Sequence, residues 1–175
     1  MIAIFEFVAL YPDWLWEHAV ALNGSSGISM IFLIGGFLGI LGAMLSGNLA
    51  NIFGGTKGIL IAGSLIIGLV TLVVAGAPEI LLVQIVVFSI FSFERSIIVP
   101  MLIANAMQDV AATERGSMNR ILNAALLIGV AVGSLVGEIA YAADKSYLLN
   151  ASISAVLLAV AAGIVAFEFR RAQPA

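Results

Sequence analysis

The sequence lacks cysteine entirely and has few charged side chains. With no cysteine among 175 residues, disulfides, thiol catalysis and thiolate metal sites are excluded. The single histidine, His18, rules out a metal site built from several histidines. Charged residues make up 10% of the chain, against about a quarter in soluble domains. These side chains are too few to cover a water-exposed surface, so lipid must be the main solvent.

Motifs for soluble chemistry are also missing. The seven Lys and Arg residues are scattered and form no basic patch for nucleic acid. No glycine loop followed by Lys-Ser or Lys-Thr is available for a nucleotide phosphate. No nucleophile stands in a pattern that would bring it to an oriented base or a metal cluster. We therefore predict no enzyme, catalytic residue, metal site, cofactor or nucleic-acid partner.

Long hydrophobic runs are what the sequence does contain. Hydrophobic residues make up 62% of it, and five stretches approach the roughly 20 residues needed to cross a bilayer as a helix. Runs of this length without apolar–polar alternation are not typical of a β-barrel. The sequence predicts an all-α, polytopic membrane helix bundle occupying residues 27–175, with a short tail. The expected spans are residues 28–50, 58–76, 80–104, 121–141 and 147–167.

Residues 1–26 fit a membrane span less well. The apolar part is short before Pro12, and acidic residues follow it. Trp14 and Trp16 resemble the aromatic belt at a membrane surface, where His18 would be solvated. We expect an interfacial helix or a partial span, and whether residues 1–22 cross the membrane is left open.

Loop charges predict the orientation. Cytoplasmic loops of membrane proteins carry an excess of Lys and Arg. The side that holds the breaks after the first and third spans and the C-terminal tail has five basic residues, whereas the other side has only Lys145. The five are Lys57, Arg115, Arg120, Arg170 and Arg171. The C-terminus is therefore expected in the cytoplasm.

Small residues recur at helical spacing in three of the spans. In lipid, helices pack through small residues that let backbones approach. Such faces suit static packing, and they also suit the sliding or rocking that transport requires. Both interpretations remain open. The stripes are Gly35, Gly39, Gly42 and Ser46; Gly129, Gly133 and Gly137 after Ala125; and Ala151, Ala155, Ala159 and Ala162.

Two charged residues lie near the middle of the third span. Each of Glu94 and Arg95 would cost about 2.5–3.5 kcal/mol facing lipid at a helix centre. Adjacent residues point about 100° apart on a helix, so Glu94 and Arg95 cannot simply neutralise each other. Eleven residues make about three helical turns, so Glu94 shares a face with Asn105 and Arg95 with Gln84. Glu94 could carry a proton or cation, while Arg95 holds an anionic group of the substrate or sets the pKa of Glu94. Alternatively, these charges form an interhelical ion pair with a residue of another helix or chain and fix the packing, or the span boundary is misplaced.

Two loop segments resemble motifs of the major facilitator superfamily. The stretch GNLANIFGGTK, residues 47–57, is similar to that family's cytoplasmic loop motif, with Gly47, Gly54 and Lys57 matching. Asn51 replaces the acidic residue of the motif, as is typical of the copy in the C-terminal half. The segment PMLIANAMQDVAATERG, residues 100–116, is similar to a later helix end and loop of the family. There the matching residues are Asp109, Glu114, Arg115 and Gly116.

The resemblance implies a C-terminal half of such a transporter, helices eight to twelve, with the seventh missing or reduced. It implies a secondary transporter in a bacterial cytoplasmic (inner) membrane, moving a small solute by alternating access. Five spans cannot enclose the family's central pathway, so the expected partner is another half-transporter chain, a second copy or a membrane complex. The alternative is a transporter-derived structural subunit or assembly factor of a larger membrane complex.

Overall fold

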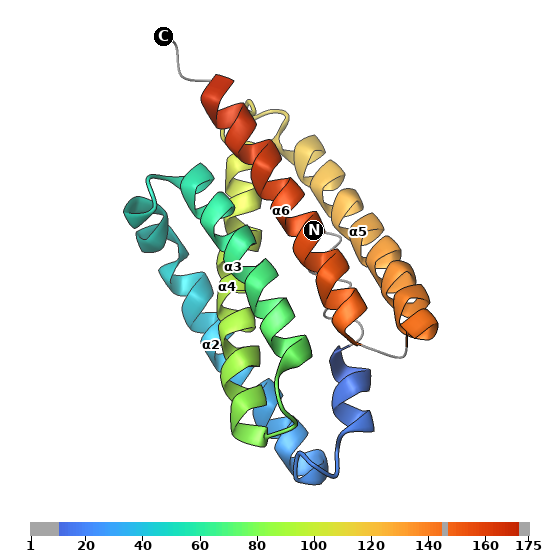
Figure 1. Cartoon of the computed structure of the whole chain (residues 1–175). Coiled ribbons are helices and arrows are strands. Elements are labelled where there is room, and N and C mark those ends of the chain that lie inside the picture. Colours follow the sequence, from blue (N-terminus) through green and yellow to red (C-terminus); the bar gives the residue numbers. More distant parts are fainter. Residues whose placement is uncertain (1–10, 145–146, 172–175) are drawn as a thin grey trace.

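The structure is a computed structural model that describes residues 11–144 and 147–171. Within these residues the chain is helical, with five long helices that run alternately up and down the bundle (Figure 1). A shorter helical segment, residues 11–17, precedes them. The long helices are α2 (Gly24–Ile52), α3 (Thr56–Gly76), α4 (Leu81–Met107), α5 (Arg115–Asp144) and α6 (Tyr147–Arg171).

All five long helices are long and apolar enough to cross a membrane. This confirms the prediction of an all-α polytopic bundle, and the chain is an integral membrane protein. Each predicted span lies almost entirely within one of the observed helices. The sequence therefore located the spans through hydropathy and length alone.

The helix ends differ from the predicted span ends, most clearly at α5. This helix begins at Arg115, six residues before the predicted span at residue 121, and the connection from α4 is reduced to residues 108–114. The residues from Arg115 to Arg120 are mostly polar, but none of them prevents helix formation. Polarity marks where the apolar stretch ends, whereas a helix can continue into the headgroup region.

The helices pack mainly as two pairs. α2 packs along α4, α3 packs along α6, and α3 also contacts α4, while α5 lies at one side against α6 (Figure 1). Gly35, Gly39 and Gly42 of α2 are buried against α4. A Cβ on Gly42 would overlap the backbone carbonyl of Phe93, so this close approach requires glycine.

The small residues of α5 and α6 behave differently from each other. On α5 the three glycines Gly129, Gly133 and Gly137 are all buried. On α6 the expected stripe is wrong at Ala159, which is exposed, while Leu158 beside it is buried. Residue 159 lies roughly 80° around the helix from Ala151, whereas residue 158 lies within about 20° of it. On α6 this rotation moves residue 159 off the buried face, whereas on α5 the same spacing leaves all three glycines buried.

The segment 11–17 contributes to the core of the bundle. Tyr11 and Leu15 are fully buried in the same cluster as Ile31 of α2, Ile67 of α3 and Phe91 of α4. Trp16, on the other side of this segment, is 57% exposed. Residues 11–17 therefore pack against the bundle through one face.

Candidate functional site

Glu94 and Arg95 lie at the middle of α4, and both are half-buried. Glu94 is the central residue of this 27-residue helix. Its carboxylate faces α3, where Oε2 lies 3.4 Å from the position that a Cβ on Gly63 would take. Arg95 instead lines a cleft between α2 and α4. The two neighbouring side chains therefore point toward different helices.

The Arg95 cleft has a volume of about 400 Å³. Its α2 wall contains Gly35, Gly36 and Gly39, and of these only Gly36 has open space at its Cβ position. The α4 wall contributes the hydroxyls of Ser92 and Ser96 beside Arg95. A guanidinium and two hydroxyls can bind an anionic or hydrogen-bond-accepting group. They lie near the middle of a helix long enough to cross a membrane.

Gln84 and Asn105 do not join this cleft. Gln84 is completely buried near the start of α4, where its Oε1 accepts a hydrogen bond from Tyr11 at 2.8 Å. Its Nε2 donates to the backbone oxygen of Pro78 at 3.3 Å. Asn105 is half-buried near the other end of α4, roughly 30 Å away along the helix axis. Gln84, Asn105, Glu94 and Arg95 therefore do not form one polar site.

The two loop segments that resemble family motifs meet at one end of the bundle. The turn between α2 and α3 contains Gly54 and Gly55, with φ of 77° and 101°, values that side-chain-bearing residues rarely adopt. Thr56 at the start of α3 and Arg115 at the start of α5 line one cavity of about 690 Å³. The motif positions here are exposed, apart from the half-buried Lys57. They are Gly47, Asn51, Gly54, Lys57, Asp109, Glu114, Arg115 and Gly116.

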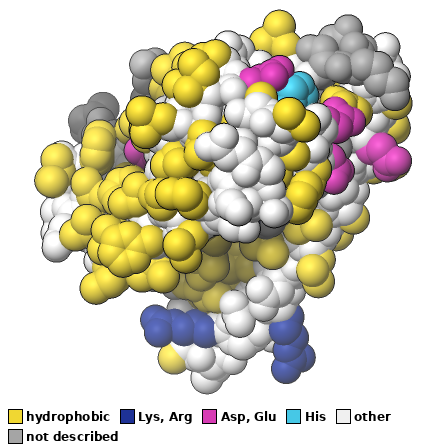
Figure 2. All heavy atoms as spheres, turned by 90° about the horizontal axis from the view of Figure 1, so that it is seen from below, with side chains coloured by type: hydrophobic (Ala, Val, Ile, Leu, Met, Phe, Trp, Pro, Cys, Tyr) yellow, Lys and Arg dark blue, Asp and Glu magenta, His cyan; other side chains and the backbone are white. Residues whose placement is uncertain are grey.

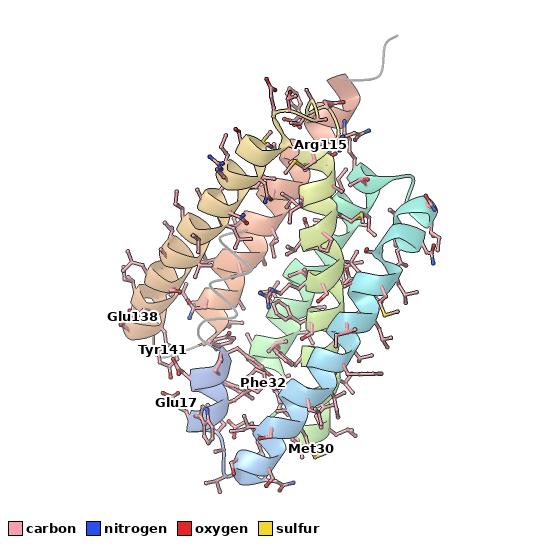
Figure 3. All side chains as sticks on the ribbon, turned by 180° about the vertical axis from the view of Figure 1, so that it is seen from behind. Glu17, Met30, Phe32, Arg115, Glu138 and Tyr141 are labelled. Atoms are coloured by element: carbon pink, nitrogen blue, oxygen red, sulfur yellow. The ribbon has the colours of Figure 1, made fainter. Side chains whose placement is uncertain are left out.

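The opposite end of the bundle holds a polar cluster that the sequence did not reveal. We call this end, with residues 18–23 and the α3–α4 turn (residues 77–80), the acidic end. His18 Nε2 lies 3.2 Å from Glu79 Oε1 while the His18 side chain is 28% exposed, so the histidine has a carboxylate partner in addition to the predicted contact with solvent. Tyr141 of α5 donates a hydrogen bond to Glu17. Figure 3 shows Glu17, Glu138 and Tyr141 close together, with Arg115 at the far end.

Comparisons of the chain with protein-family models, curated protein sequences and solved structures found no match. The resemblance of residues 47–57 and 100–116 to transporter loop motifs therefore remains a prediction. Function is inferred from the geometry of this chain itself.

Proposed function

We propose that the chain is the C-terminal half of a secondary transporter of the major facilitator type and moves a small solute by alternating access. The order of the two loop motifs and the five-helix bundle support this assignment. A second half, supplied by another chain, a second copy or a membrane complex, completes the pathway. The basic residues Lys57, Arg115 and Arg120 lie where α3 and α5 begin, at one end of the bundle, which supports a cytoplasmic location for that end in a bacterial inner membrane.

The observation that carries this proposal is the Arg95 cleft. A charged side chain at bilayer depth must face protein or a water-filled cavity, because lipid cannot solvate it. Arg95 borders a cavity with two hydroxyls, at a helix contact made smooth by glycine. In the proposed mechanism Arg95 binds an anionic group of the solute, and Glu94 carries the coupling proton or cation on the face toward α3.

The natural absence of cysteine provides a direct test. We expect Ser96→Cys to react with a charged, membrane-impermeant thiol reagent in sealed vesicles, because the cleft admits water. Leu69→Cys is the matched control, since Leu69 on α3 is 64% exposed on the lipid-facing surface and should not react. Alternating access further predicts that reagent reaches residue 96 from either side of the membrane. Equal protection of the two cysteines would contradict a water-filled cleft.

The alternative function, a structural subunit or assembly factor, is favoured by the position of α5. In the most apolar 18-residue stretch of α5, only 22% of the residues are buried within the chain, against 44% in the corresponding stretch of α3. Its outer face presents Leu127, Ile128 and Leu135, which are each about three-fifths exposed. Native mass spectrometry after gentle solubilisation distinguishes the two functions. A stable, stoichiometric complex with unrelated subunits supports the alternative, whereas a second half-transporter or a second copy supports the transporter.

A further inference from the structure

A cavity of about 590 Å³ lies at the acidic end, where four parts of the chain converge. The segment before α2 contributes Trp14, Glu17 and His18, and the α3–α4 turn contributes Glu79. Tyr141 of α5 and Tyr147 of α6 complete the aromatic lining. This volume is within the range of small-molecule sites, roughly 300–1,000 Å³. The cavity thus combines carboxylates with aromatic rings from separate elements.

The electrostatic environment of this cavity favours a cation. Glu17 and Glu79 line it, Glu138 lies at the same end, and Asp13 lies close enough to Tyr141 to act on it electrostatically. Acidic side chains gather around the single histidine in Figure 2. Lys57 lies in the first turn of α3, and Arg115 and Arg120 lie in the first two turns of α5, at the opposite end of the bundle. A concave site lined with one sign of charge raises the local concentration of the opposite ion.

His18 shows how a cation is held here. Its ring lies on Trp14 with centroids 4.5 Å apart and planes 28° apart, and its Nε2 is 3.2 Å from Glu79 Oε1. Its Nδ1 is 2.8 Å from the backbone oxygen of Trp14. Both ring nitrogens therefore face acceptors, and only the protonated imidazolium donates from both. An aromatic face together with a carboxylate is the arrangement that recognises organic cations.

We propose that this cavity binds a small organic cation, and that protonated His18 competes with it for Glu79 and the face of Trp14. The described residues contain no group of three potential ligands arranged to hold a metal ion, which favours an organic cation over a metal. Glu17 keeps acceptor capacity beside its bond from Tyr141, because a carboxylate has about four lone-pair sites. The inference does not depend on transport by the Arg95 cleft.

Competition with His18 gives the binding a pH dependence. The groups that face His18 are Glu79 from the α3–α4 turn, Glu17 and Trp14 from its own segment, and the phenols of Tyr141 and Tyr147. Of these side-chain types, histidine is the one that changes charge between pH 5 and 8. Because histidine side chains gain positive charge on acidification, the external cation is expected to bind more weakly at lower pH.

Tryptophan fluorescence tests the proposal, because both tryptophans of the chain, Trp14 and Trp16, belong to the segment before α2. In a Trp16→Phe background, Trp14 is the only tryptophan and borders the cavity. Tetramethylammonium added to the protein in nanodiscs at pH 8 should change its emission saturably, with weaker affinity at pH 5.5. Neutral tert-butanol, of similar shape, should give no saturable change. Absence of saturation, or equal effects of the two probes, would overturn the proposal.

Variants in the same background identify the residues responsible. Glu79→Gln should weaken tetramethylammonium binding about fivefold, because it removes the negative charge of a half-exposed carboxylate that would contact the cation. Glu138→Gln, an exposed acid at the same end that does not line the cavity, should leave affinity within about twofold. His18→Asn should remove the pH dependence. Equal effects of the two glutamine variants would refute the assigned site, and an unchanged pH dependence in His18→Asn would refute the competition.

Discussion

At the scale of single residues, the buried pair of Tyr11 and Gln84 joins the segment 11–17 to α4. The Gln84 side chain has no exposure, so its amide must be satisfied inside the protein. Tyr11 supplies one hydrogen bond and the Pro78 carbonyl accepts the other. Burial raises the pKa of Tyr11 well above the value of an exposed tyrosine. The phenol therefore stays protonated and remains a donor.

Tyr11→Phe should destabilise the protein by about 1–3 kcal/mol, because it leaves Gln84 Oε1 buried without a donor. Denaturant unfolding in detergent micelles measures this difference. Tyr141→Phe is the control, since it loses a hydrogen bond at a half-exposed position and should cost less than about 1 kcal/mol. Equal losses in the two variants would show that the buried hydrogen bond contributes no more to the free energy of unfolding than the exposed one.

The same tyrosine predicts how stability changes at high pH. The folded-state pKa of Tyr11 is raised, so its contribution is complete below about pH 10, where a tyrosine in the unfolded chain ionises. Above that pH the unfolded state loses the proton first, and stability falls as pH rises. The stability difference between the native chain and Tyr11→Phe should therefore shrink above pH 10. A constant difference up to pH 11 would argue against the buried phenol.

At the scale of elements, hydropathy predicted the spans but not their contacts. The five apolar runs located the helices, whereas polar residues after Met107 hid the early start of α5 at Arg115. The glycines of α2 identified its packing face, because three of them and the nearby Ser46 are buried. The alanines of α6 identified its packing face in part: Ala151 and Ala162 are buried, whereas Ala159 is exposed, because alanine also suits a lipid-facing surface.

Gly42→Ala should separate α2 from α4, because the added Cβ overlaps the Phe93 carbonyl, which is fixed backbone. We expect a loss of about 1–3 kcal/mol in the free energy of unfolding. Gly47→Ala is the matched control on the same helix, since nothing lies within 4 Å of its Cβ position. This control should be neutral or slightly stabilising, because alanine is the better helix former. Similar losses in both variants would contradict the close contact.

At the scale of the whole molecule, the two candidate sites differ in how far sequence could predict them. Charge in an apolar run identified Glu94 and Arg95, and helix geometry predicted their different directions. The cavity at the acidic end brings together Glu17, Glu79 and Tyr141, which are separated by more than 60 residues at each step. No local pattern links such positions. They meet only because alternating helices return the chain to the same end.

The central claim is that the chain crosses the bilayer with the α4–α5 connection and the α5–α6 connection on opposite sides. Ala112 and Ala142 are exposed and lie near the two ends of α5, so each can be replaced by cysteine in a separate variant. Sealed vesicles of known orientation, treated with a membrane-impermeant thiol reagent, measure which cysteine reacts from which side. We predict that residue 142 reacts from outside and residue 112 only after reagent enters the cytoplasmic side. Labelling of both cysteines from the same side would contradict the account.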